Sequence, residues 1–287
     1  MGYIQSFDPW KSAFCTCPAK YSLNPYTGCA HRCLYCYATS FIKNFYYPRP
    51  KKEFLKVIKK ELEKLPKGAL LSLSNSSDPY QPLEKIFHYT RNFLEMLLRK
   101  DFKILIITKS SLILRDLELL KNIRCAVSIT LTSKSLNSKL EPGAPSYEER
   151  LEAIKVLSQR GIPVSVRLDP IIPKLNEEEL LEILEEVAPW IKHLTVSTYK
   201  AKFDSFKRLG NAFPELKKDW EKLYFKDGEK YHGSFYLKKE LRYTLIKPFY
   251  EKAQRYGLSF ATCREILKDF ENPKRCDGSF LIPNIVY

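Results

Sequence analysis

The chain of 287 residues is long enough to bury the core of one large α/β domain, or of one domain with an extension. Hydrophobic residues make up 44% of it and aromatic residues 13%, which excludes an intrinsically disordered chain. The formal net charge of +15 favours a polyanionic partner such as nucleic acid, although a solvated surface of lysine and glutamate would give the same balance.

No stretch approaches the roughly 18 consecutive apolar residues that a membrane span needs. The first residues also lack the charged and apolar blocks of a signal peptide. We therefore expect a soluble, cytoplasmic protein. In that reducing compartment the eight cysteines are more typical of metal binding or catalysis than of disulfide bonds.

Short β-rich runs alternate with helical patterns along the first two thirds of the chain. Strands are expected at residues 20–24, 70–74, 103–108, 125–131, 162–168 and 193–197. Apolar residues at steps of three and four predict helices at residues 51–65, 89–100, 146–160 and 176–190. Ser146 is expected to cap the third helix together with Glu149, and Gly161 to end it.

This alternation predicts parallel strands joined by right-handed crossovers, with helices covering the sheet. Six such units favour an α/β fold with an open, partial (β/α)6 TIM-like barrel, whose C-terminal face carries the polar strand ends. From about residue 199 the sequence becomes aromatic, basic and largely helical. We therefore expect a barrel domain over 1–198, and a helical C-terminal extension over 199–287 that covers the open side.

Three cysteines are crowded into the segment NPYTGCAHRCLYCYA. Cys29, Cys33 and Cys36 have the spacing C-x3-C-x2-C, which cannot complete a tetrahedral zinc site without a distant fourth ligand. Three thiolates can instead hold three irons of a 4Fe–4S cluster and leave the fourth iron open. The alternatives are a zinc site completed by His31 or Cys17, or thiols without a metal.

This loop resembles the signature of the radical S-adenosylmethionine (SAM) superfamily. Other motifs are similar to the spore photoproduct lyase-like group, whose members are often labelled DNA repair photolyases. These motifs are SSDPYQPLE (76–84), ITKSSLILRDLELL (107–120), the segment 128–173 with LEPGAPSYEER, and CDGSFLIP (276–283). The resemblance implies a 4Fe–4S cluster whose open iron binds S-adenosylmethionine, reductive cleavage of that cofactor, and hydrogen abstraction from a substrate. It also implies a reductant of the ferredoxin or flavodoxin type.

The resemblance further implies that polar residues at the strand ends hold S-adenosylmethionine. Tyr35 would lie near the adenine, Asp78 would take the place of an acidic residue that holds the methionine amino group, and Ser128 would contact the ribose. The alternatives are a turn around Asp78, hydroxyl groups that satisfy the backbone, and a structural ion pair between Arg167 and Asp169. The candidate cofactor-binding residues are Tyr35, Asn75, Ser77, Asp78, Lys109, Ser128, Thr130, Arg167 and Asp169.

Four other cysteines lie toward the two ends of the chain. Cys15, Cys17, Cys263 and Cys276 match the four ligands of a second iron–sulfur cluster. The alternatives are unrelated reduced thiols, or a thiol that returns hydrogen to a substrate radical. Cys125 is expected to be buried at the base of a strand. No catalytic residue is assigned, and the candidates are Cys263, Cys276 and Tyr199.

The substrate expected from the charge and the resemblance is a nucleic acid, either a DNA lesion or an RNA nucleotide. Aromatic residues interleaved with basic ones in the extension would stack flipped bases, or else are ordinary helix packing. The alternative substrate is a peptide or protein, and a third hypothesis is a structural zinc or iron–sulfur module that binds nucleic acid without catalysis. These aromatic residues are Tyr199, Phe203, Phe206, Tyr231, Phe235, Tyr236 and Tyr243. Glu141 and Arg150 belong to the motif EPGAPSYEER, and they either take part in the function or form a salt bridge within the loop.

Overall fold

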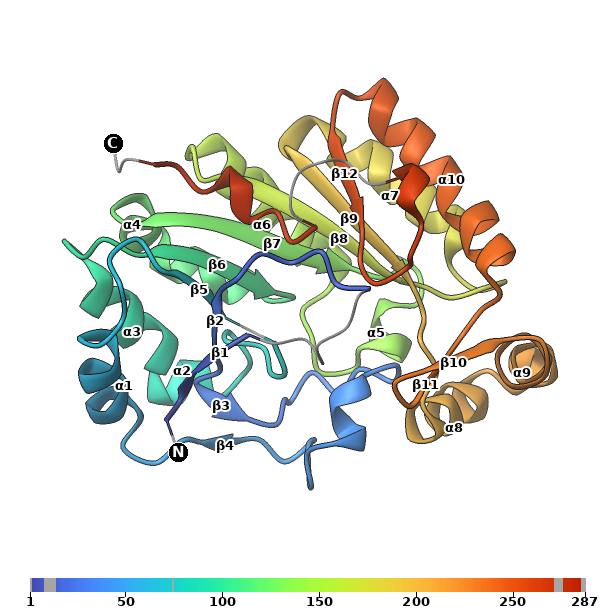
Figure 1. Ribbon diagram of the computed structural model, residues 1–287, viewed down its shortest axis with the longest axis horizontal. Coiled ribbons are helices and arrows are strands. Elements are labelled where there is room, and N and C mark those ends of the chain that lie inside the picture. Colours follow the sequence, from blue (N-terminus) through green and yellow to red (C-terminus); the bar gives the residue numbers. More distant parts are fainter. Residues whose placement is uncertain (1, 8–13, 74, 271–275, 285–287) are drawn as a thin grey trace.

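The computed structural model describes residues 2–7, 14–73, 75–270 and 276–284. Its main sheet has the strand order β1-β2-β5-β6-β7-β8-β9-β12, and the two edge strands do not pair with each other (Figure 1). All neighbours from β2 to β12 are parallel, whereas β1 is antiparallel to β2. The strands are β1 (Ile4–Ser6), β2 (Tyr21–Leu23), β5 (Leu70–Leu73), β6 (Lys103–Thr108), β7 (Arg124–Leu131), β8 (Val164–Ile171), β9 (His193–Thr198) and β12 (Ser259–Thr262). The expected open, partial barrel and its six predicted strands are confirmed.

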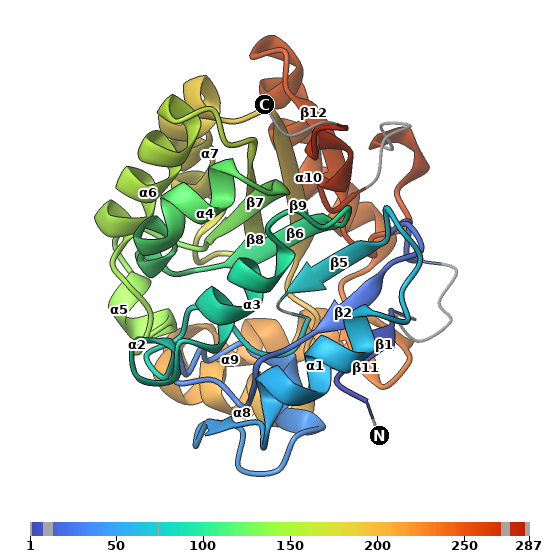
Figure 2. The same cartoon turned by 90° about the vertical axis from the view of Figure 1, so that its left-hand side faces the viewer.

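Helices cover the outer face of this sheet (Figures 1 and 2). They are α1 (Phe54–Leu62), α3 (Tyr89–Leu97), α4 (Leu117–Lys121), α6 (Tyr147–Gln159), α7 (Glu177–Val187) and α10 (Lys239–Arg255). Fully buried side chains such as Phe54, Phe93 and Leu184 pack against strand residues such as Val127 and Val166 in one large apolar core. Over the described part of the chain, every helix is too short or too polar to cross a bilayer.

The start and end of α6 follow the expected signals. The backbone N–H of Glu149 donates to the Ser146 hydroxyl at 3.2 Å, and the Ser146 N–H donates to the Glu149 carboxylate at 2.8 Å. Gly161 follows the helix with a φ of 78°, a conformation that glycine adopts without strain.

The chain after β9 forms a second apolar core before it returns to the main sheet. This core surrounds Trp220 and Tyr224 and includes the partly buried Leu34 and Tyr35 of the cysteine loop. Its elements are α8 (Phe203–Ala212), α9 (Pro214–Glu221), the π-helical turn Lys222–Lys226, and the hairpin of β10 (Glu229–Tyr231) and β11 (Ser234–Tyr236). The strand β12 was not predicted from the sequence, because four residues are too few to show a strand pattern within a largely helical region.

The segment 276–284 crosses the face of the sheet that the helices leave uncovered. Ile282 packs against Leu70, Leu105 and Ala126, whose strand neighbours point into the helix-covered core. The Cys276 carbonyl accepts a hydrogen bond of 2.7 Å from the Thr195 hydroxyl on β9. Part of the interior of the open barrel is therefore filled by residues that are distant in sequence from its strands.

Candidate functional site

A cavity of about 580 Å³ opens where the parallel strands end, and the cysteine loop forms part of its wall. Cys29, Cys33 and Cys36 all line it. Ser128 does not line it: the residue is buried in β7, and its hydroxyl oxygen has no hydrogen-bond partner among the described residues. The predicted cofactor-binding residues that do line the cavity are Tyr35, Asn75, Ser77, Asp78, Lys109, Thr130, Arg167 and Asp169.

The cysteine loop follows β3 (Tyr26–Thr27), which pairs with β4 (Arg49–Pro50). Gly28 has a φ of 84°, and the N–H of Cys29 donates to the Phe45 carbonyl at 2.8 Å. Burial raises the pKa of the Cys29 thiol to about 12 and also raises the pKa values of the other two loop thiols. The thiols are therefore neutral at pH 7 without a metal, and metal binding displaces their protons.

Two neighbouring segments clamp the loop backbone. The Gln81 side chain accepts from the Ala30 N–H and donates to the Gly28 carbonyl, both at 3.0 Å. On the other side, the Gly143 N–H donates to the His31 carbonyl at 3.0 Å. A Cβ atom at position 143 would lie 2.0 Å from the Ala30 carbonyl oxygen, so only glycine allows the two backbones to approach this closely.

Asp78 anchors the loop that follows β5. Its carboxylate accepts from the N–H groups of Tyr80 at 2.9 Å and Lys109 at 2.7 Å, and from the Thr108 hydroxyl at 2.7 Å. His31 Nδ1 lies 3.5 Å from the same carboxylate. These contacts within the chain favour a structural role for Asp78, and its contact with the methionine amino group stays a prediction.

Asn24, which was not among the predicted residues, also organises this loop. Its side-chain oxygen accepts from three successive backbone N–H groups, those of Asn75, Ser76 and Ser77, at 3.1–3.3 Å. Asn75 in turn donates to the Ser22 hydroxyl at 2.6 Å. Asn24 directly follows β2, and that position at a strand end was the signal that could have revealed it.

A buried carboxylate, Glu141, is the centre of the next group. It pairs with Arg150 at 2.5 Å, accepts from the Thr132 hydroxyl at 2.8 Å and from the Tyr35 hydroxyl, and lies 3.9 Å from the Lys109 ammonium. Burial alone would raise the pKa of Glu141, but Arg150 and Lys109 lower it to about 2. The salt bridge between Glu141 and Arg150, which was one of the two predictions for this block, is thus present. The hydrogen bond to Glu141 also fixes the orientation of the Tyr35 ring.

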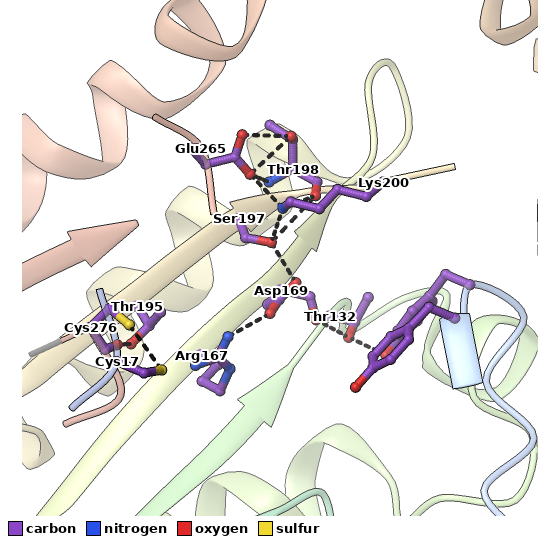
Figure 3. A network of polar contacts seen from close by, with 12 residues as sticks. Cys17, Thr132, Arg167, Asp169, Thr195, Ser197, Thr198, Lys200, Glu265 and Cys276 are labelled. Carbon is purple, nitrogen blue, oxygen red and sulfur yellow. Dashed lines mark hydrogen bonds and ion pairs between the residues drawn. The ribbon is translucent and has the colours of Figure 1, made fainter. Parts of the chain in front are cut away.

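A chain of polar contacts runs along the ends of β8 and β9 (Figure 3). Arg167 pairs with Asp169 at 2.9 Å, and Asp169 accepts from the Ser197 hydroxyl at 2.9 Å. Lys200 then donates to the Ser197 hydroxyl at 2.9 Å and pairs with Glu265 at 2.7 Å. The ion pair of Arg167 and Asp169, which was the structural alternative, is present on the cavity wall. Burial would raise the pKa of Asp169, but Arg167 and Lys200 hold it below its usual range.

Arg208 of α8 reaches the cysteine loop from the extension. Its guanidinium donates to the carbonyls of Leu34 and Cys36, both at 3.0 Å, and to the Thr39 hydroxyl at 2.9 Å. Asp204, one helical turn earlier, pairs with Arg208 at 3.1 Å and also accepts from Thr39. In the sequence, Asp204 and Arg208 stand four residues apart, which is typical of an ordinary ion pair on a helix surface. That spacing gives no indication of a contact with the cysteine loop.

Replacing Arg208 with alanine is expected to loosen the cysteine loop. Two carbonyls would lose a charged donor, which costs about 1.5–3 kcal/mol per bond in comparable cases. Lys207→Ala, on the exposed side of the same helix, is the matched control. We expect the Arg208 variant to bind less iron after anaerobic reconstitution, and the Lys207 variant to match the wild type. Equal iron in all three proteins would contradict this role.

The remaining predicted residues also gather here. Cys15, Cys17, Cys263 and Cys276 line the same cavity. Tyr199 lines it too, and its hydroxyl lies 2.7 Å from that of Ser205. The catalytic roles considered for Cys263, Cys276 and Tyr199 stay predictions. Seven aromatic residues of the extension were considered for base stacking. Three of them, Tyr199, Phe206 and Tyr236, are buried, which favours ordinary packing. Of the seven, only Phe203 is exposed.

Comparisons with known proteins concern the family and the fold of the chain. A family model described as Radical SAM superfamily matches residues 23–187. An uncharacterized protein of Methanocaldococcus jannaschii is 37% identical over 179 residues, which are 60% of this chain and 67% of that protein. A radical SAM Nα-GlyT isomerase of Pseudomonas phage M6 is 25% identical over 267 residues, and the match covers 84% of this chain but only 53% of the isomerase. The structure of spore photoproduct lyase complexed with dinucleoside spore photoproduct superposes with a TM-score of 0.68 at 19% identity, over 84% of this chain and 75% of the lyase, which shows a shared fold.

Proposed function

Since this chain belongs to the radical SAM superfamily, we propose that it cleaves S-adenosylmethionine at a 4Fe–4S cluster held by Cys29, Cys33 and Cys36, and abstracts a hydrogen atom from a nucleotide of a nucleic acid. When bound, the cluster and S-adenosylmethionine supply a radical strong enough to remove hydrogen from carbon, using an electron from a separate reductant. The residues fit these groups, because the three loop thiols, two of them buried, share one cavity with charged side chains such as Lys109 and Arg167.

The chain itself holds the loop and shields the site. Gln81 and Arg208 bind loop carbonyls, so the thiols are presented by a backbone fixed at several points. Phe45 and Ile42 add apolar surface to the cavity wall, which reduces the access of water to a reactive radical. Lys109 and Arg167 provide cations for the carboxylate of S-adenosylmethionine.

The observation that carries the choice of substrate is an exposed aromatic ring at the cavity. Phe41 lines the cavity and is 60% exposed, and the ammonium of Lys202 lies 4.6 Å from the centre of its ring. Tyr37, which also lines the cavity, is 41% exposed. Aromatic rings beside a cation suit an unstacked base and its adjoining phosphate. Such an arrangement supports a nucleic acid over an uncharged small molecule.

Two further facts support this choice. The net charge of +15 favours a polyanion. Spore photoproduct lyase, which shares the fold, has been solved in complex with a dinucleoside photoproduct.

The cofactor chemistry is tested without the substrate. The anaerobically reconstituted protein, given a strong reductant and S-adenosylmethionine, is expected to release 5′-deoxyadenosine and methionine. The triple variant Cys29→Ala/Cys33→Ala/Cys36→Ala should release neither, whereas Cys125→Ala, changed at a buried thiol of β7, should behave as the wild type. Release by the triple variant would refute the assignment of these ligands.

Substrate recognition is tested by binding of single-stranded and damaged duplex DNA and of transfer RNA. We expect Phe41→Ala to weaken binding by about 1–3 kcal/mol, the usual contribution of one base stacked on an aromatic ring. Tyr47→Ala is the control, because Tyr47 is 72% exposed but does not line the cavity. Affinity should fall as salt rises. Absence of binding at low salt, together with turnover of a peptide, would refute a nucleic-acid substrate.

A further inference from the structure

Four cysteines outside the three-cysteine loop share its cavity. Cys15, Cys17, Cys263 and Cys276 come from three separate segments: the stretch before β2, the residue directly after β12, and the start of the segment 276–284. All four are free thiols. The fold thus brings together every cysteine of the chain except Cys125, which is buried on β7.

The backbone holds these thiols at defined places. The sulfur atoms of Cys17 and Cys276 are 3.5 Å apart, although 259 residues separate them in sequence (Figure 3). The Cys276 carbonyl is bound by Thr195 of β9 at 2.7 Å. The N–H of Cys263 donates to the Val196 carbonyl of the same strand at 2.9 Å. The backbones of Cys263 and Cys276 are therefore bound by two adjacent residues of β9, the strand next to the edge of the sheet.

Cationic groups lie next to these thiols. The buried ammonium of Lys20 is 3.7 Å from the Cys17 sulfur and 2.6 Å from the Asp277 carboxylate. The guanidinium of Arg167 also interacts with the Cys263 thiol. N–H donors and positive charge beside sulfur stabilise an anionic cluster and tune its potential.

We propose that Cys15, Cys17, Cys263 and Cys276 bind a second iron–sulfur cluster. Four thiolates are the full ligand set of a 4Fe–4S cluster, so this centre, unlike the first, would have no open iron. The proposal does not depend on the identity of the substrate.

A single metal ion fits the geometry less well. Within the described ranges, no three His, Cys, Asp or Glu side chains stand close enough together to share one ion. The three thiols of the cysteine loop do not form such a group either, whereas the ligands of a cluster are distributed over several irons. Thiols distributed along a cavity wall therefore suit a cluster better than zinc.

The deciding experiment leaves the proposed ligands untouched. The variant Cys29→Ala/Cys33→Ala/Cys36→Ala is reconstituted anaerobically, and its iron, acid-labile sulfide and zinc are measured beside the wild type. We expect about four irons and four sulfides per chain in the variant, and about eight of each in the wild type. After reduction, the variant should show an electron paramagnetic resonance signal that S-adenosylmethionine does not change, because no iron is open.

The reciprocal variant Cys15→Ala/Cys17→Ala/Cys263→Ala/Cys276→Ala should keep about four irons and a signal that S-adenosylmethionine does change. Cys125→Ala should keep about eight. A triple variant without iron, zinc without sulfide, or a Cys17–Cys276 disulfide in the reconstituted protein would each overturn the proposal. Iron retained in the triple variant, with no cleavage of S-adenosylmethionine by the wild type, would instead refute the proposed function alone.

Discussion

Replacing Gly143 with alanine is expected to abolish iron loading at the three-cysteine loop, and with it the cleavage of S-adenosylmethionine. The added Cβ would lie 2.0 Å from the Ala30 carbonyl oxygen and 3.0 Å from its carbon. Both are backbone atoms, which cannot rotate away as a side chain would. The loop must therefore separate from residue 143 and lose the hydrogen bond between Gly143 and His31. Overpacking of this kind costs about 1–3 kcal/mol and occasionally more, and here it falls on the cluster ligands.

Gly161→Ala separates this clash from the general effect of removing a glycine. Gly161 has a φ of 78°, and a Cβ there would meet nothing within 4 Å. Its replacement should cost about 1 kcal/mol of backbone strain without any loss of iron. Iron content after reconstitution and the midpoint of urea unfolding measure the two effects. A Gly143 variant that loads as much iron as the Gly161 variant would show that the loop tolerates the shift.

Replacing Glu141 with glutamine is expected to destabilise the fold by about 3–5 kcal/mol, because Arg150 would remain buried without its counter-charge. The lowered pKa of Glu141, about 2 against an ordinary value of 4.5, corresponds to about 3 kcal/mol and agrees with that range. Glu118→Gln is the control, since its exposed pair with Lys121 should contribute less than about 1 kcal/mol. Replacing both partners, Glu141→Leu with Arg150→Met, should restore much of the loss.

The pH dependence of stability provides an independent check. Because the folded protein lowers the pKa of Glu141, this group stabilises the fold fully above pH 4.5 and loses its contribution as the pH falls toward 2. The difference in unfolding free energy between the wild type and Glu141→Gln should therefore shrink over that interval. A difference that stays constant from pH 5 to pH 2.5 would mean that Glu141 is not ionised in the fold.

The sequence predicted the sheet better than it predicted the site. Strands such as β6 and β7 could be predicted, because each is a continuous apolar run in the sequence with a helical pattern before and after it. The spacing of the loop cysteines predicts three cluster ligands that are local in sequence, and the structure places all three on the wall of one cavity. The role of Asp78 was harder to predict, since the Thr108 hydroxyl that satisfies it lies 30 residues away. Arg208 could not be predicted at all, because its partners in the cysteine loop are more than 160 residues distant.

Position along the chain has a consequence for biosynthesis. The ribosome makes a chain from the N-terminal to the C-terminal side, so the three-cysteine loop emerges before the segment 276–284, which emerges after every strand of the sheet. Until then Leu70, Leu105 and Ala126 lack the side chain of Ile282 that covers them, and Cys17 lacks its neighbour Cys276. Contacts between such distant residues form slowly. We therefore expect the interior of the barrel to close only after translation has passed residue 284, and nascent chains halted before residue 276 to be more sensitive to protease than the finished protein.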